Sequence, residues 1–258
     1  MPPALREAYG GDLAFPAGER PHVYANFVST LDGLVSYGIP GLASARSISR
    51  GHPGDRLAMG LLRAVADVVV AGSGTLRAEG KVTWTPQQIF PAAADLYREV
   101  RLARGLPERT RVAIITASGD VDLSAAVFGS PDVEPFIVTS VAGAERLAAS
   151  GARAVRVRAV GDVAPTMRDA IDAIVAETGA RLILSEAGPG LFGRMLEERV
   201  VDELFLTLAP HLAGRSPGRP GIGLVDPVAF EHERAPWAHL ISAKRCDDFL
   251  LLRYAFRG

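Results

Sequence analysis

Short runs of apolar, often β-branched residues recur along the chain, and several are followed by a helical pattern. Val68-Val69-Val70 is the clearest of these runs. Uniformly apolar strands are typical of a parallel sheet that is buried on both faces. In an antiparallel sheet with one solvent-exposed face, by contrast, apolar and polar residues alternate along each strand. Their alternation with helices predicts an α/β fold: a mostly parallel central sheet flanked by helices.

The apolar patterns also predict where the elements lie. We expect strands at residues 21–28, 67–71, 112–116, 136–139, 155–157, 181–184 and 204–208. We expect helices at residues 55–63, 92–106, 141–149, 164–177 and from 191 onward. Residues 239–245 and 249–256 predict a C-terminal antiparallel hairpin at one edge, and the Gly-rich stretches 33–52 and 213–223 predict long loops. We predict an irregular N-terminal arm at 1–20. Because no linker or repeat is visible, we predict one domain at 21–258.

Composition excludes several classes of function. The net charge of −1 over 258 residues argues against a broad electrostatic attraction to nucleic acid or to an anionic membrane. The single cysteine, Cys246, excludes an intrachain disulfide and a multi-cysteine zinc site. The histidines show no metal-ligand spacing, so we predict no metal site. Since neither a signal peptide nor a run of about 20 apolar residues is present, we expect a cytoplasmic protein.

Three loops that follow predicted strands carry glycine together with hydroxyl or carboxylate residues. They are residues 29–33, 72–75 and 186–190. The carboxyl ends of parallel strands share one edge of a sheet, so these loops are expected to converge on one crevice. Three ordinary turns are the alternative, since Asp32-Gly33 is also a common turn pair. The basic cluster Arg46, Arg50, His52 and Arg56 fits a phosphate site or a solvated loop equally well.

The stretch Ser185-Glu186-Ala187-Gly188-Pro189-Gly190 joins a predicted strand to a predicted helix. A glycine-rich turn at this place exposes the first N–H groups of the helix, and the helix dipole favours a phosphate there. Glu186 lies beside it, at the end of the strand. The pattern predicts a nucleotide cofactor next to a polar substrate. It differs from GxGxxG, however, and it also fits an ordinary structural turn between a strand and a helix.

Taken in order, these motifs resemble the reductase domain of the riboflavin-biosynthesis deaminase/reductase family, whose fold is like that of dihydrofolate reductase. The resemblance covers residues 22–256 and rests on the segments 29–33, 61–64, 67–75, 186–189 and 201–210. It implies a reductase similar to 5-amino-6-(5-phosphoribosylamino)uracil reductase, in which NADPH delivers hydride to C1′ of the ribosylamino group. The zinc-deaminase motifs are absent from this sequence, so we expect a stand-alone reductase.

The resemblance also implies roles for individual residues. Catalytic roles fall to Asp32, as a candidate for proton transfer, and to Glu186. Substrate contacts fall to Ser47, Arg63, Lys81 and Glu186. Cofactor contacts fall to Ser29, Gly72, Gly74, Thr75, Glu79, Ser118, Gly188, Pro189, Gly190, Leu191, Phe192 and Gly193.

One segment departs from the family pattern. Bifunctional members often carry Asp-Asp-Pro, Leu-Thr and an arginine after the second glycine turn, whereas residues 79–85 here lack that arginine and offer only Lys81. The substrate therefore stays open between the phosphorylated pyrimidine and another small molecule, such as the pterin dihydrofolate. A non-catalytic nucleotide-binding protein is the alternative from another class. The resemblance further implies a homodimer, for which the strand at 204–208 and the terminal hairpin are candidate interfaces.

Overall fold

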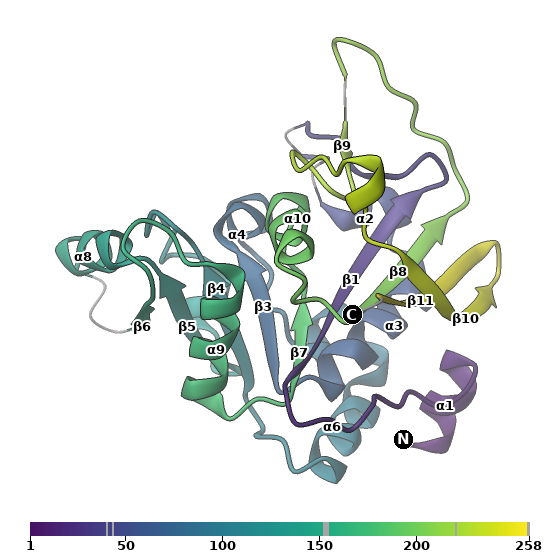
Figure 1. The fold of residues 1–258 in the computed structure, drawn as a ribbon. Coiled ribbons are helices and arrows are strands. Elements are labelled where there is room, and N and C mark those ends of the chain that lie inside the picture. Colours follow the sequence, from purple (N-terminus) through teal and green to yellow (C-terminus); the bar gives the residue numbers. More distant parts are fainter. Residues whose placement is uncertain (40, 43, 152–154, 220, 257–258) are drawn as a thin grey trace.

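One sheet organises the molecule. The computed structural model describes residues 1–39, 41–42, 44–151, 155–219 and 221–256. Over these residues the sheet has nine strands in the order β10-β11-β8-β1-β7-β3-β4-β5-β6 (Figure 1). The strands are β1 (His22–Thr30), β3 (Val68–Gly72), β4 (Thr110–Ile115), β5 (Val133–Thr139), β6 (Arg156–Ala159), β7 (Leu182–Ser185), β8 (Glu203–Ala209), β10 (Ala238–Cys246) and β11 (Phe249–Phe256).

The pairing confirms the predicted fold class. Neighbouring strands from β8 to β6 are all parallel. The C-terminal hairpin is antiparallel, with β11 paired to β8 and β10 paired to β11. The helices are α1 (Pro3–Tyr9), α2 (Ala45–Ser49), α3 (Pro53–Val65), α4 (Ser73–Ala78), α5 (Pro86–Ile89), α6 (Ala94–Ala103), α7 (Ala126–Gly129), α8 (Val141–Ala149), α9 (Met167–Thr178) and α10 (Pro189–Glu197).

Strand β3 shows why the apolar runs predicted a two-sided sheet. Successive side chains of a strand point to opposite faces. Val69 packs into the cluster that contains Leu61 and Leu62 of α3, and Val68 and Val70 pack into the cluster formed with α9 and α10. Fully burying one such side chain contributes roughly 1.5–3 kcal/mol, so both faces of the strand stabilise the layers.

The structure corrects several local expectations. Residues 3–9, predicted as part of an irregular arm, form α1, and its Leu5 and Tyr9 join the core. The segment predicted as a long loop at 33–52 holds β2 (Leu34–Ser36) and α2, and β2 pairs with β9 (Ile222–Gly223). The glycine turn at 72–75 opens directly into α4. These elements depend on contacts with distant residues, which local periodicity does not report.

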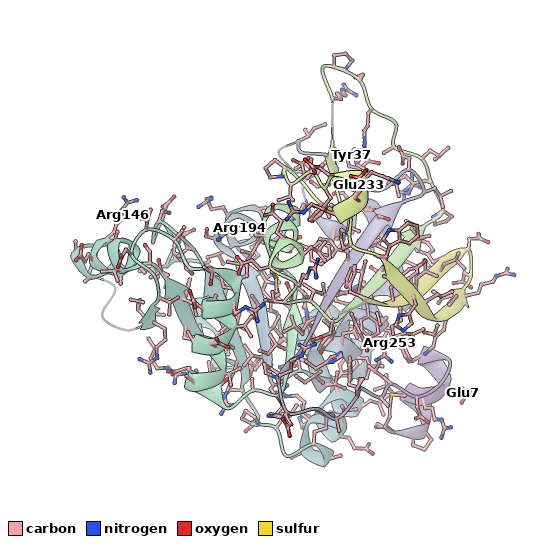
Figure 2. The ribbon with its side chains drawn as sticks, in the orientation of Figure 1. Glu7, Tyr37, Arg146, Arg194, Glu233 and Arg253 are labelled. Carbon is pink, nitrogen blue, oxygen red and sulfur yellow. The ribbon has the colours of Figure 1, made fainter. Side chains whose placement is uncertain are left out.

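Strand order places the carboxyl ends of β1, β7 and β3 next to one another in the middle of the sheet (Figure 1). Helix α10 begins after β7 with Gly188 as its N-cap and Pro189 in its first turn, and no side chain of a described residue caps it. Arg194 lies on this helix, far from Arg253 on β11 (Figure 2). Within the described residues, every helix is too short or too polar to cross a bilayer.

Candidate functional site

A large cavity lies at the carboxyl ends of the central strands. Its volume is about 1220 Å³. Helix α3 contributes one row of side chains to its wall, Asp55, Met59 and Arg63, because residues four apart lie on the same face of a helix. Opposite them lie the turn after β3 and the glycine-rich start of α10. Two of the three predicted loops, at 72–75 and 186–190, therefore converge on one crevice.

Arg63 and Glu186 form a buried ion pair in the cavity wall. Arg63 Nε donates to Glu186 Oε1 at 2.9 Å, and Arg63 Nη2 donates to Glu186 Oε2 at 2.6 Å. The side chains are 3% and 9% exposed. Arg63 Nη1 also donates to the carbonyl oxygen of Thr85 at 3.3 Å. This two-point contact holds the Glu186 carboxylate in one orientation at the cavity surface.

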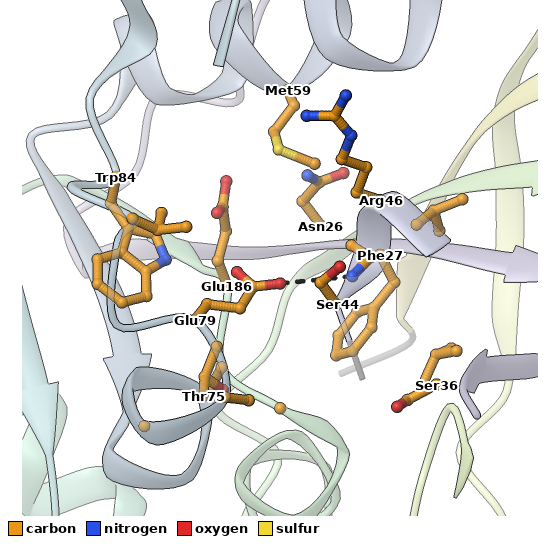
Figure 3. A pocket seen from close by; sticks show the side chains of 18 of the residues that line it. Asn26, Phe27, Ser36, Ser44, Arg46, Met59, Thr75, Glu79, Trp84 and Glu186 are labelled. Carbon is orange, nitrogen blue, oxygen red and sulfur yellow. Dashed lines mark hydrogen bonds between the residues drawn. The ribbon is translucent and has the colours of Figure 1, made fainter. Parts of the chain in front are cut away.

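Glu79 lies beside this pair and, among the residues that the structure describes, forms no ion pair of its own. Its Oε1 accepts a long hydrogen bond from the backbone N–H of Ala45, at 3.4 Å (Figure 3). Burial raises the pKa of Glu79 above its ordinary value, and the negative charge of Glu186 raises it further. The cavity wall therefore holds one carboxylate paired with an arginine and, beside it, one carboxyl group whose pKa is raised.

A second, smaller cavity adjoins the first. Its volume is about 350 Å³, and it shares Gly72, Gly74, Gly190 and Leu191 with the larger one. Thr116, at the end of β4, lines it, and its buried hydroxyl has no hydrogen-bond partner in the described part of the chain. The start of α10 reaches both cavities. Pro189 has no N–H and the Leu191 N–H donates to the carbonyl oxygen of Gly188 at 3.1 Å, so an anion lying across their junction would meet the Gly190 N–H and the positive end of the helix dipole.

Most of the residues singled out from the sequence line the larger cavity. These are Arg63, Gly72, Gly74, Thr75, Glu79, Lys81, Glu186, Gly188, Pro189, Gly190 and Leu191. The structure does not place the others in either cavity wall: Ser29, Asp32, Ser47, Ser118, Phe192 and Gly193.

Packing explains why two residues of α10 miss the wall. Phe192 is fully buried in the core. At Gly193 a Cβ would lie 2.8 Å from Cγ2 of Val228, so the missing side chain serves close packing of the segment at 225–228 rather than a ligand. Ser118 follows Ala117, which lines the smaller cavity, and its hydroxyl accepts a hydrogen bond from the N–H of Asp120 at 3.2 Å.

Asp32 holds a turn together. Its carboxylate accepts hydrogen bonds from the Thr30 hydroxyl at 2.6 Å and from the backbone N–H groups of Ala213 at 3.1 Å and Gly214 at 2.8 Å. These bonds, led by that of Thr30, lower the pKa of Asp32 from 3.8 to about 2. A group so acidic is a poor proton donor near neutral pH, and both of its oxygens are already occupied.

Sequence reasoning missed several residues of the wall, among them Asn26, Asp55, Met59 and Trp84. Asp55 and Met59 share the face of α3 that carries Arg63, and this i, i+4, i+8 spacing was a signal available in the sequence. Asn26 lies inside β1 rather than in the loop after it. Trp84 gave no signal, since its position depends on the segment between α4 and α5.

One group has the composition of a metal site, although sequence spacing predicts none. His52, Cys246 and Asp247 each offer a ligand atom, and these atoms lie within 4.8 Å of one another. His52 Nε2 lies 3.2 Å from Asp247 Oδ2. The three residues come from the start of α3 and from the turn of the terminal hairpin, so only the tertiary fold brings them together.

The architecture is similar to that of several solved structures. The Acinetobacter baumannii RibD structure (form 1) superposes with a TM-score of 0.69 at 17% identity, covering 93% of this chain and 59% of that chain. A pyrimidine reductase-like protein from Corynebacterium diphtheriae gives 0.67 at 22% identity, covering 92% of each chain. The riboflavin biosynthesis reductase Rib7 of Saccharomyces cerevisiae gives 0.63 at 15% identity, covering 99% of each chain. This chain thus spans little more than half the length of the Acinetobacter protein.

Sequence comparison agrees with the structural one. No curated protein sequence matches the chain. Residues 21–243 match the RibD C-terminal domain, which is most of the chain and includes the strands and loops that form the larger cavity. The resemblance noted from the motifs is thereby confirmed: the chain belongs to the RibD C-terminal domain family.

Proposed function

We propose that this protein is an NADPH-dependent reductase of the pyrimidine reductase type, acting on a ribosylamino-pyrimidine phosphate. The observation that carries the proposal is the convergence of the Arg63–Glu186 pair and the glycine-rich start of α10 on one cavity. At about 1220 Å³ the cavity exceeds the range of roughly 300–1,000 Å³ typical of sites for one small ligand. It has room for a cofactor and a substrate together.

The residues at the junction of the two cavities fit a dinucleotide. The Gly190 N–H and the positive end of the α10 dipole suit a pyrophosphate, and Gly72 and Gly74 leave room for close approach. The unpartnered hydroxyl of Thr116 supplies a polar contact further along. When bound, the nicotinamide group would supply the hydride. The adenosine end would then lie beyond Thr116, on the side of Ser118.

The Arg63–Glu186 pair would position the sugar. Each Glu186 oxygen accepts one hydrogen bond from the guanidinium and keeps a lone pair for a substrate hydroxyl. Because Arg63 is itself buried and bonded to Thr85, the carboxylate cannot rotate away. Such fixed orientation brings the reacting carbon into line with the hydride donor.

Glu79 is the proton donor in this proposal, in place of Asp32. Reduction of the open-chain imine needs a proton at nitrogen as hydride reaches carbon. Glu79 lines the cavity and its pKa is raised by burial, so it holds a proton at higher pH than an ordinary glutamate. Asp32 instead anchors the segment at 213–214.

Two exposed cations on the cavity wall, Lys81 and Arg46, are the proposed phosphate contacts. Lys81 takes part of the role of the missing family arginine. Arg63 is excluded from it because its charge is already neutralised by Glu186. The altered segment also supports a second candidate, a reductase of the same fold that acts on a pterin such as dihydrofolate.

The assembly we propose is a homodimer in the cytoplasm. Strand β8 lies inside the sheet, so it offers no free edge. Strand β10 is the edge, and its Leu240 and Ile241 are 52% and 43% exposed. A second copy of the chain would cover these side chains. Light scattering on the wild type and on Leu240→Glu tests the interface, because a charge there should shift a dimer to monomer.

The first test of the proposed function is a titration with NADPH and NADH. Trp84 lines the cavity and is 1% exposed, whereas Trp237 is 72% exposed, so Trp237→Phe leaves one tryptophan that reports on the site. Selective quenching by NADPH, followed by its oxidation with the pyrimidine ribose-phosphate, is the expected result. Oxidation with dihydrofolate alone would favour the pterin reductase. Binding without turnover on either would indicate a non-catalytic nucleotide-binding protein, and no binding would overturn the proposal.

A further inference from the structure

Asp55 differs from the other deeply buried acids of the protein. Glu177, Glu186 and Glu203 each lie against an arginine. Asp55 is only 4% exposed, yet among the described residues no arginine or lysine lies at ion-pair distance from its carboxyl group. Burying a charge without a partner costs several kcal/mol, so this position favours a neutral acid.

The immediate surroundings of Asp55 are hydroxyl groups. The hydroxyl groups of Ser49, at the end of α2, and Thr207, on β8, lie near its carboxyl and lower its pKa. Burial is the largest influence on the pKa of Asp55 and raises it above 3.8, although both hydroxyls and the nearby His52 lower it and Glu186 raises it. The His52 ring is engaged elsewhere, with Nε2 at 3.2 Å from Asp247 Oδ2 and the ring stacked on Phe249 at 4.0 Å.

Asp55 also lines the larger cavity, together with Asn26 of β1 and Met59 one turn further along α3. The Asp55 side chain comes from the first turn of α3, a helix whose Leu61 and Leu62 are buried in the core, so its position is rigid. A buried acid that served only the packing of α3 would not need to line the cavity. Its place there points to a ligand.

The chemistry of a neutral carboxyl group limits what that ligand presents. It offers one O–H donor and one C=O acceptor side by side, whereas a carboxylate offers two acceptors. The complement of the neutral form is an –NH–C(=O)– edge, and the complement of the carboxylate is an amidinium-like edge with two N–H donors. The two forms therefore select different heterocycles.

We propose that Asp55 recognises the substrate ring by pairing, as a neutral acid, with its –NH–C(=O)– edge. This inference rests on the proposed function, since it places the heterocycle of the substrate in the same cavity. It goes further in naming the residue and the ring chemistry: a lactam edge rather than an amidine edge. In this arrangement Glu186 positions the sugar and Glu79 donates the proton.

The test is calorimetric binding of small heterocycles to the full chain, without turnover. The probes are 5,6-diaminouracil, its 1,3-dimethyl derivative, which lacks ring N–H groups, and 2,4-diaminopyrimidine, which lacks carbonyl groups. We expect the first to bind, and the other two to bind at least ~10-fold more weakly, a loss of about 1.4 kcal/mol. We expect Asp55→Ala to weaken diaminouracil binding by a similar factor.

Asp55→Asn is the matched control, because an amide keeps one donor and one acceptor in the shape of the neutral acid. It should bind diaminouracil about as well as the wild type. Loss of binding in Asp55→Asn together with a preference for diaminopyrimidine would show a carboxylate and overturn the proposal. Unchanged binding in Asp55→Ala, or no binding of diaminouracil to the wild type, would overturn it as well.

Folding and cofactor binding are measured separately on the same samples. Thermal unfolding shows whether Asp55→Ala remains folded, and Thr207→Val removes one hydroxyl partner to show how much stability the local contacts supply. A variant with normal NADPH affinity and weak diaminouracil affinity supports the role of Asp55. If the wild type binds diaminouracil through Asp55 but binds no NADPH, the reductase proposal fails while the ring-recognition proposal stands.

Discussion

Two buried Arg–Glu pairs in this protein have nearly the same geometry and lie in different surroundings. Arg63 contacts Glu186 at 2.9 and 2.6 Å, and Arg253 contacts Glu203 at 2.7 and 2.9 Å. The first pair lines the large cavity. The second joins β11 to β8, and its guanidinium lies over the ring of Phe15, with its centre 4.8 Å from the ring centroid.

The second pair makes further contacts within the protein. Arg253 Nη2 donates to the carbonyl oxygen of Ala14 at 2.8 Å, and His22 Nε2 lies 3.3 Å from Glu203 Oε1. These contacts tie the N-terminal segment to the hairpin, and neither Arg253 nor Glu203 lines either described cavity. An ion pair by itself therefore does not mark a site. Exposure of one member to a cavity is what gives the Arg63–Glu186 pair a chemical role.

Glu186→Gln should have the largest effect, because it removes both roles at once. Leaving the Arg63 charge buried without its partner should cost about 3–5 kcal/mol of unfolding free energy. Turnover of the folded protein should fall about 100-fold as the sugar loses its positioning contact. Urea unfolding and steady-state kinetics measure the two losses, and full kcat in the variant would contradict the assigned role.

Glu203→Gln should reproduce only the first of these losses. Arg253 would be left uncompensated, at a similar cost of about 3–5 kcal/mol. Kinetic constants of the folded protein should stay at the wild-type level, since Glu203 is outside the wall of the cavity. Urea titration shows whether this variant is folded. If it is folded and its kcat falls as far as that of Glu186→Gln, the distinction between the two pairs is wrong.

Glu79→Gln extends the comparison to an acid that has no arginine partner in the described ranges. Because burial raises the pKa of Glu79, its proton is retained above pH 4.5 and is lost as the pH rises through the raised value. Activity that needs this proton should decline over the same range. The variant should lose about 100-fold in kcat and also lose that limb of the pH profile. A profile identical to the wild type would exclude Glu79 as the donor.

Asp32→Asn should have the smallest effect. The pKa of Asp32 is lowered to about 2 in the folded protein from an ordinary 3.8, so its stabilising contribution is complete above about pH 4 and is lost as the pH falls toward 2. The variant should lose about 1 kcal/mol at neutral pH and show a weaker acid dependence, with unchanged kcat. Acid unfolding monitored by circular dichroism measures this, and a large loss of kcat would restore Asp32 to the active site.

Much of the architecture was predictable because its signals are local. The buried run at 68–70 and the helix at 141–149, which the structure reproduces with the same bounds, depend on side-chain periodicity and burial within one segment. The glycine-rich turn at 188–190 likewise identified the start of α10. Helix α1 was missed because Leu5 and Tyr9 bury themselves against the core, in a segment with weak periodicity of its own.

The residues of the candidate site likewise fall into two groups, those identified from sequence motifs and those whose role only the folded structure reveals. Arg63, Glu186 and the glycine turns were found because their motifs could be recognised in order along the chain. Asp32 was assigned a proton role because its residue type and turn suited one, and only the folded protein shows its carboxylate bonded to the backbone at Ala213 and Gly214. Asp55 belongs to none of the family motifs, and its lack of an arginine or lysine partner among the described residues is visible only once its neighbours in the fold are known.

The sequence alone determined the layers of this protein, because strand and helix periodicities of two and 3.6 residues follow from backbone geometry. The tertiary structure decided which acidic side chains form an ion pair with an arginine. Arg63 and Glu186 lie 123 residues apart in the chain and meet because β1, β7 and β3 are neighbours in the sheet. Charge, burial and hydrogen bonding depend on distances across such crossovers. These distances distinguish Glu186, which has an arginine partner, from Asp55 and Glu79, which have no ion-pair partner within the described part of the chain.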